Sequence, residues 1–413
     1  MGSMLMCLSS ALIGVLVFLR KRSLLGEALS HAAYPGVVAG VWVGSTLGLV
    51  AAEWLPLVIL IGASLSALGG MWMIDWLDRR FRVKSDAALC LVLSIFFGVG
   101  VLLASYLQST HALSARLIQV FLYGQAATLV RAHVIVYAFL AAATVIALLV
   151  FHHPLRILLC DPSYARSIGM RAKALDGLVF ALLVFAIVIG MRSMGVVLMA
   201  GMLIAPAVGA RQWTGRLPAL FILAGLFGAI SGFAGNYLSV EIPRGFSLPT
   251  GPMILLCASA IALFSLLFAP KRGVLSRCWR IFAFRQQCRA ENILKYLWKQ
   301  EGRQVDFKEL QQRQALSPMW IRWLMHRLTK QGWVKQGLLT EDGRMKGEQL
   351  VRLHRLWEVY LVSLGQGREK VHCSAEEMEH ILTPEIEKEL TALLNDPRQD
   401  PHHQPIPRPT EGI

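Results

Sequence analysis

The feature that most constrains the fold is a series of long apolar stretches confined to the first 270 residues of this 413-residue chain. About 20 apolar residues in a helix span the core of a bilayer. The first 270 residues carry only 25 charged side chains, whereas the remaining 143 carry 42. We therefore predict an all-α polytopic membrane domain followed by a soluble tail, and we exclude a single soluble enzyme. The nine candidate spans lie at roughly residues 4–19, 33–52, 55–74, 87–107, 133–151, 176–191, 194–210, 218–239 and 252–269.

The basic residues between these spans predict the orientation of the chain in the membrane. Short cytoplasmic loops are enriched in Lys and Arg. With the N-terminus outside, 13 basic residues of the membrane half fall in inward-facing loops and four on the opposite side. Residues 1–22 are apolar and then basic, the reverse of a cleavable signal peptide, and are interpreted as a first span. We expect the tail to lie in the cytoplasm.

An ionisable pair lies near the start of the chain. Glu27 and His31 are four residues apart, on one face of a helix that begins just after the basic residues 20–22. Ionisable side chains near membrane depth are costly and mark ion pathways. A carboxylate with an imidazole suits Mn²⁺, Fe²⁺ or Zn²⁺. The alternative is an interfacial hydrogen bond between the two side chains, without a role in transport.

Four motifs follow one another along the membrane half. They are SLLGEALSHA with a Pro-Gly at 35–36, DPSYA at 161–165 with Gly169, GVVLMAGMLIAPA at 195–207, and LPTGP at 248–252. In this order they resemble ZnuB/TroC-like permeases, the membrane subunits of bacterial ABC importers for zinc, manganese and iron, over about residues 5–273. The resemblance implies a multi-pass protein of the cytoplasmic membrane in which Glu27 and His31 line the metal path or its gate. The implied partners are a metal-delivering solute-binding protein and a second permease subunit, identical or different.

The second motif is the expected contact with the energy source. The chain has no G-x-x-x-x-G-K-[ST] phosphate loop and no Gly-Lys dipeptide at all. ATP hydrolysis is therefore expected in a separate ABC ATPase subunit, and we do not expect this chain to be an enzyme. The resemblance implies that the cytoplasmic loop facing the ATPase contains Asp161, Pro162, Ala165 and Gly169. The alternative is a plain basic loop on the inner side.

The tail is predicted to contain several short elements. Residues 307–315 form a helix with Asp306 as N-cap, and Ser317-Pro318 opens a second helix that Gly332 ends. A β-wing at 333–340 is closed by residues 341–343. The predicted parts are the membrane domain 1–273, a basic linker 274–289, a winged helix-turn-helix 290–345, metal-binding and dimerisation helices 346–395, and a flexible end 396–413.

The charge of the tail is divided between two regions. Residues 271–355 carry a net charge of +12 and residues 356–413 a net charge of −6, against +9 for the membrane half. A basic winged helix followed by an acidic, His-containing segment indicates a DNA-binding unit coupled to a cation sensor. The alternative is a solvated surface with uneven charge.

Two stripes of histidine and carboxylate residues lie in this acidic region. The first is His354 with Glu358, and the second is His372, Glu376, Glu379 and His380, at helical spacing. Two such stripes on neighbouring helices can converge on a divalent metal ion. The alternative is an acidic, solvated helix with stray histidines.

Residues 290–407 resemble iron-dependent (DtxR-type) and manganese-dependent (MntR-type) repressors. The matching motifs include VRLHRLWE at 351–358, VHCSAEEMEHIL at 371–382 and DPHHQPIP at 400–407. Glu376 stands where iron-type members have Cys, which favours Mn²⁺ or Fe²⁺ over Zn²⁺. The resemblance implies an ancillary site of His354, Glu358 and His372, and a primary site of Glu376, Glu379, His380 and Asn292, the last where the family has Met or Asp.

The same resemblance implies a metal-tightened homodimer whose second winged-fold helix enters the major groove of operator DNA. Trp320 is alternatively a packing residue within the domain. The predicted DNA-binding residues are Ser317, Pro318, Met319 and Trp320 at the helix start, near bases or sugars, and Arg322, Arg327 and Lys330, nearer phosphates.

The whole chain is thus identified as a permease–repressor fusion. A membrane-tethered repressor reaches chromosomal operators poorly, and known fusions of this kind release the repressor by cleavage, so we predict proteolysis between Pro270 and Ala290. Two alternatives stay open. The tail is either a cytoplasmic metal-sensing gate on transport, or a degenerate, purely structural appendage.

Overall fold

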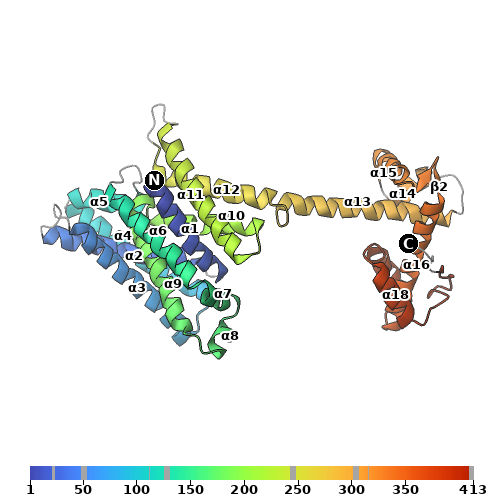
Figure 1. Ribbon diagram of the computed structural model, residues 1–413, viewed down its shortest axis with the longest axis horizontal. Coiled ribbons are helices and arrows are strands. Elements are labelled where there is room, and N and C mark those ends of the chain that lie inside the picture. Colours follow the sequence, from blue (N-terminus) through green and yellow to red (C-terminus); the bar gives the residue numbers. More distant parts are fainter. Residues whose placement is uncertain are drawn as a thin grey trace. The chain divides into compact units, whose positions relative to one another are not determined.

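The computed structural model describes residues 1–20, 24–47, 54–110, 112–124, 131–241, 248–300, 307–314 and 316–408. It contains two compact units, residues 1–277 and 278–413 (Figure 1). The boundary lies close to the change of composition that the sequence places near residue 270. Each unit is described by itself.

The first unit is a helical bundle. Among the described residues, eight helices are long and apolar enough to cross a membrane. The helix α2 is also long but is not among these eight, because it carries Glu27, Ser30 and His31 within its length; it begins nine residues before the expected second span. The helices are α1 (Gly2–Leu19), α2 (Leu24–Thr46), α3 (Leu55–Phe81), α4 (Ser85–Thr110), α5 (Ala112–Tyr123), α6 (Arg131–Val150), α7 (His152–Cys160), α8 (Pro162–Ser167), α9 (Ala172–Met194), α10 (Val196–Trp213), α11 (Leu217–Glu241) and α12 (Thr250–Phe268).

Glycines bring the helices of this bundle into backbone contact. A Cβ atom on Gly36 of α2 would lie 2.1 Å from the carbonyl oxygen of Gly62 on α3, and one on Gly14 of α1 would lie 1.8 Å from that of Leu203 on α10. Small residues at membrane helix interfaces permit such close approach. The Pro-Gly motif at residues 35–36 therefore has a packing role, because it seats α2 against α3.

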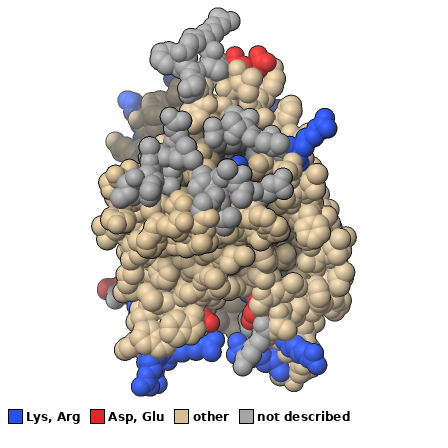
Figure 2. All heavy atoms as spheres, turned by 90° about the vertical axis from the view of Figure 1, so that its left-hand side faces the viewer, with Lys and Arg blue, Asp and Glu red and all other residues tan. Residues whose placement is uncertain are grey.

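Basic side chains gather at one end of the bundle. Figure 2 shows Lys and Arg along the lower edge of one face, below a broad band of other residues. The N-terminus and α8 lie at opposite ends (Figure 1). Arg20, at the end of α1, pairs with Asp176 of α9 at 2.7 Å. Such a gathering of basic residues is expected of the inner surface of a membrane protein. Lys21 and Arg22, which are part of the predicted basic loop, lie outside the described residues.

The second unit is a small winged fold followed by helices. Its core joins α13, α14, α15 and the wing. In the wing, Val334 pairs with Leu339 in antiparallel register. The elements are α13 (Val274–Lys299), α14 (Phe307–Gln314), α15 (Pro318–Lys330), β1 (Val334–Lys335), β2 (Leu338–Leu339), α16 (Glu341–Ser363), α17 (Arg368–Met378) and α18 (Pro384–Leu393). Asp306 lies outside the described residues.

Two boundaries of the tail differ from expectation. The linker and the first tail helix form one continuous helix, α13, because residues 274–299 contain no Gly or Pro. Gln336 and Gly337, with φ of 53° and 81°, close the wing as a two-residue hairpin turn. Residues 341–343, expected to close it, instead begin α16, where the Thr340 hydroxyl accepts a hydrogen bond from the Gly343 N–H at 3.1 Å.

The segment expected to be a flexible end is attached to α16 over its described part. Buried Arg352 donates to the Pro407 carbonyl at 2.6 Å, and Arg355 pairs with Asp400 at 3.5 Å and donates to the Pro405 carbonyl. Asp400 is itself buried. Buried Arg352 and half-buried Arg355 thus hold residues 400–407 in place. Residues 409–413 lie outside the described part of the chain.

Candidate functional site

The helix α2 carries both predicted residues of the transport path. His31 is buried, and its ring packs edge-on against Phe97 of α4 with centroids 4.6 Å apart. Its Nδ1 atom has no hydrogen-bond partner among the described residues. Glu27 lies half-buried one turn earlier. Pro35 lies four residues after His31 in α2 and has no N–H to donate to the His31 carbonyl.

The four predicted coupling residues shape a helical corner between α7 and α9. Asp161 caps α8 by accepting hydrogen bonds from the N–H groups of Ser163 at 2.8 Å and Tyr164 at 3.0 Å. Pro162 is the first residue of α8, a position where proline is tolerated. Ala165 is buried against α7 and α9, and Gly169 has a φ of 75°. The motif therefore builds the corner, while exposed Tyr164 and Ile168 form part of its surface.

The predicted DNA-binding residues lie on α15, most of them on its exposed side. Ile321, Leu324 and Leu328 are buried in the core of the unit. Trp320 is half-buried, and the centroid of its ring lies 6.1 Å from that of Phe282 on α13 and 5.5 Å from that of Trp323. Packing is thus part of the role of Trp320. The residues exposed on α15 and its N-cap include Ser317, Pro318, Met319, Arg322 and Lys330, and Arg327 is half-buried.

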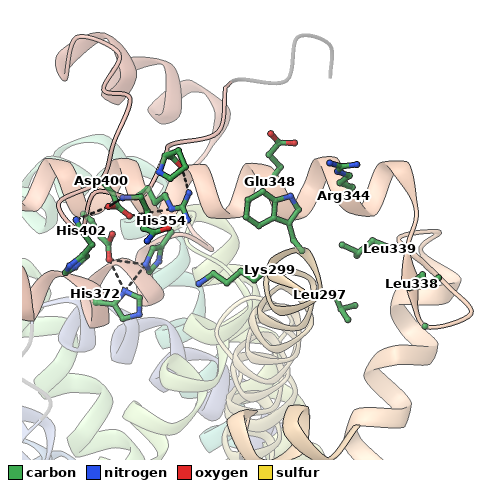
Figure 3. A pocket seen from close by; sticks show the side chains of 16 residues that line it. Leu297, Lys299, Leu338, Leu339, Arg344, Glu348, His354, His372, Asp400 and His402 are labelled. Atoms are coloured by element: carbon green, nitrogen blue, oxygen red, sulfur yellow. Dashed lines mark hydrogen bonds and ion pairs between the residues drawn. The ribbon is translucent and has the colours of Figure 1, made fainter. Parts of the chain in front are cut away.

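Three side chains predicted to form the ancillary site converge. His354 and Glu358 lie on α16 and His372 on α17. His354 Nε2 is 3.2 Å from Glu358 Oε1 and 3.0 Å from His372 Nδ1, and His372 Nδ1 is 2.8 Å from Glu358 Oε1. Figure 3 shows His354 and His372 turned toward each other in the wall of a pocket of about 1020 Å³. We call these three residues the triad.

The triad fits a divalent transition metal. One ligand atom from each residue lies within 4.8 Å of the others, and two imidazoles with a carboxylate are a borderline donor set. The side chain of His372 is 52% exposed, which leaves an access route from solvent. The His354 Nδ1 atom lies 2.5 Å from Glu379 Oε2, the carboxylate contact that commonly orients a metal-bound histidine.

The hydrogen bonds of the triad favour the charged forms of Glu358 and His354. Burial disfavours the charged forms of Glu358 and His354, but the hydrogen bonds between them outweigh it. The contacts with His354 and His372 lower the pKa of Glu358 to about 2. The contacts with Glu358 and Glu379 raise the pKa of His354 above its ordinary 6.5. Below this raised pKa, a metal ion must displace a proton from His354.

Of the four residues predicted as a primary site, His380 contacts both Asn292 and Glu379, whereas Glu376 contacts His372 of the triad. His380 contacts Asn292 Oδ1 through Nε2 at 3.2 Å and Glu291 Oε2 through Nδ1 at 2.6 Å. The Glu376 side chain is 53% exposed, and its Oε1 atom lies 3.8 Å from His372 Nε2. Glu379 Oε1 is 3.6 Å from His380 Nε2, but both of its oxygens also contact Lys295.

Sequence reasoning missed Glu291 and Lys295 on α13. Their one signal is a spacing of four residues, which predicts an ion pair between them. Instead each has a partner beyond α13, with Glu291 bound to His380 and Lys295 to Glu379. The hydrogen bonds from His380 and Gln287 outweigh the burial of Glu291 and lower the pKa of its carboxyl.

Comparison with known proteins agrees with this division of the chain. A family model described as "ABC 3 transport family" matches residues 1–269. The chain belongs to this family. A second model, "Iron dependent repressor, metal binding and dimerisation domain", matches residues 340–408 and so includes the triad. The resemblance to a permease fused to a metal-dependent repressor is confirmed.

Relatives of this ABC 3 transport protein extend over both units. It is 34% identical to a probable metal transport system membrane protein of Chlamydia trachomatis, over 98% of this chain and 94% of the relative. It is 35% identical to the manganese transport system membrane protein MntC of Bacillus subtilis, over 87% of this chain and 82% of the relative. The solved structure of PsaBC from Streptococcus pneumoniae in complex with Fab matches with a TM-score of 0.57 at 25% identity, covering 66% of this chain and 90% of that chain. The chain is therefore a multi-pass membrane protein.

Proposed function

We propose that the membrane unit is the permease subunit of an ABC importer for a divalent transition metal, with Mn²⁺ as the leading candidate. The buried imidazole of His31, one turn beyond Glu27 and with a nitrogen that has no partner in the described part of the chain, supports a metal path along α2. The relative MntC is named for manganese transport. The partners are a solute-binding protein, a second permease subunit, identical or different, and a separate ATPase docking at the α8 corner through Tyr164 and Ile168.

The permease proposal is tested by metal uptake in cells that carry His31→Ala. We expect uptake of radioactive Mn²⁺ to be lost because the path loses its imidazole, while the ATPase still copurifies with the variant. Normal uptake would remove His31 from the path. Failure of copurification would indicate a folding defect, and His31→Gln, which keeps a polar side chain of similar size, then repeats the measurement.

We propose that the tail is a metal-dependent transcriptional repressor lying in the cytoplasm. The triad supports this function, since two helices bring together three ligands that are up to 18 residues apart. Metal bound there would tie α16 to α17 and favour a homodimer. In that dimer the exposed face of α15, with Met319, Arg322 and Lys330, would meet operator DNA.

Proteolytic release of the repressor is part of this proposal. Residues 274–290 of the predicted cleavage interval lie within α13, and a helix must open locally before a protease can cut it. We therefore expect the cut at residues 270–273, before the helix. Blotting native cells for the tail tests this: a soluble fragment is expected, and full-length, membrane-bound protein alone would contradict release.

A second function for the tail is favoured by one observation. The helix α13 is continuous from Val274 to Lys299 and itself carries Asn292 to His380 and Lys295 to Glu379, the carboxylate that contacts His354 of the triad. A metal-sensing gate on transport would use such a connection. A gate predicts that Mn²⁺ on the cytoplasmic side slows uptake in proteoliposomes containing the ATPase, and that His372→Ala relieves the inhibition. A rate of uptake that does not change with the Mn²⁺ concentration on the cytoplasmic side would exclude the gate.

A further inference from the structure

A lysine lies inside the group of side chains expected to bind metal. Lys295 Nζ is 2.7 Å and 2.9 Å from the two carboxylate oxygens of Glu379, and the exposed fractions of the two side chains are 10% and 0%. Both carboxylate oxygens therefore already contact a cation. We propose that Lys295 is a built-in cation that takes the place of a second metal ion, so that the tail binds one divalent ion per chain, at the triad. This inference rests on the proposed metal-sensing function.

The second contact of Glu379 gives this carboxylate a different role. Its Oε2 atom is 2.5 Å from His354 Nδ1, while His354 Nε2 faces Glu358 and His372. A carboxylate at Nδ1 fixes the tautomer with its hydrogen on that atom and leaves Nε2 free to bind metal. Glu379 is thus a positioning residue for the triad and not a ligand. Lys295 compensates the negative charge that this role buries.

The remaining residues of the expected primary site do not offer an alternative centre. His380 Nδ1 contacts Glu291, and its Nε2 contacts Asn292 and lies 3.6 Å from Glu379 Oε1, the oxygen that Lys295 already holds at 2.7 Å. Within the described residues, the triad is the group of three His, Cys, Asp or Glu side chains whose ligand atoms lie close enough to hold an ion. A second divalent ion at Glu379 would lie beside the buried ammonium of Lys295, where like charges repel strongly because water screens them poorly. The structure therefore favours one ion over two.

The experiment counts Mn²⁺ bound to the purified full-length chain by equilibrium dialysis and elemental analysis. The membrane unit contributes equally in every variant, so differences report on the tail. We expect His354→Ala to lose one ion relative to the parent, and Lys295→Gln to gain one because Glu379 becomes available as a ligand. Lys295→Arg keeps the charge and is expected to bind the parental number. The matched control is Lys299→Gln, an exposed lysine one turn further along α13, also with the parental number.

Two further variants keep the inference open to refutation if Lys295→Gln fails to fold. In the parent, Glu379→Gln should weaken binding at the triad by 10- to 100-fold, as for the loss of an orienting carboxylate, without removing a second ion. The double variant Lys295→Gln/Glu379→Gln should bind the parental number. A parental number in Lys295→Gln, or two ions lost in Glu379→Gln, would overturn the inference. An unchanged number in His354→Ala would instead refute metal sensing by the tail.

Discussion

Replacing Gly36 by alanine should separate the helix that carries the transport path from its neighbour. The added Cβ would lie 2.1 Å from the carbonyl oxygen of Gly62, which is backbone and cannot turn aside as a flexible side chain can. Overpacking of this kind costs about 1–3 kcal/mol. Gly→Ala within a helix recovers about 0.5–1 kcal/mol. We therefore expect a net loss of stability, and lower uptake because α2 also positions His31 against Phe97.

Gly69→Ala is the matched control. Gly69 lies on α3, and a Cβ there would have nothing within 4 Å. The helix-propensity gain is common to both variants, so the difference between them reports the clash alone, about 1–3 kcal/mol. Thermal unfolding of the two purified variants in one detergent measures it. Equal melting temperatures would refute the reasoning that backbone contact at Gly36 holds α2 in place.

Three other predictions concern the corner, the triad and the DNA face. Asp161→Ala removes the acceptor for two backbone N–H groups and should destabilise α8 by about 0.5–2 kcal/mol. We expect less ATPase to copurify with this variant, and full copurification would contradict the prediction. Because the pKa of His354 is raised, protons compete with metal for this side chain. The affinity for Mn²⁺, measured by titration, should therefore rise about tenfold per pH unit below that pKa. An affinity that does not change with pH would exclude His354 as a ligand. Lys330→Ala should weaken binding to all DNA sequences alike and lower the salt slope by about 1 in anisotropy titrations; loss at one sequence only would indicate base readout.

The parts of the fold that could be predicted from sequence are those fixed by local pattern. Long apolar stretches identify the membrane spans because each must satisfy its backbone within one helix. The shorter helices α5, α7 and α8 escaped prediction, since 6 to 12 residues carry too little periodic signal. The change of composition near residue 270 indicates a linker, but residues 274–299 contain no Gly or Pro and so form a continuous helix.

The candidate sites divide in the same way. A spacing of four residues places His354 and Glu358 on one helix face, and the resemblance added His372 from α17. By contrast, Lys295 and Glu379 are 84 residues apart, and no local pattern indicates which helix face will meet which. The resemblance predicts Glu379 as a metal ligand because Glu379 matches a ligand position of the family. Matching positions one by one does not show that tertiary packing brings Lys295 against this carboxylate.

Metal-dependent DNA binding by the tail tests the central claim most directly. The measurement is fluorescence anisotropy of DNA from upstream of the chain's own operon, titrated with the purified full-length chain with and without Mn²⁺. We predict tight binding only with Mn²⁺, abolished by His354→Ala and retained in Lys299→Gln. DNA binding that is equally tight without metal, or none in either condition, would contradict a metal-dependent repressor attached to this permease.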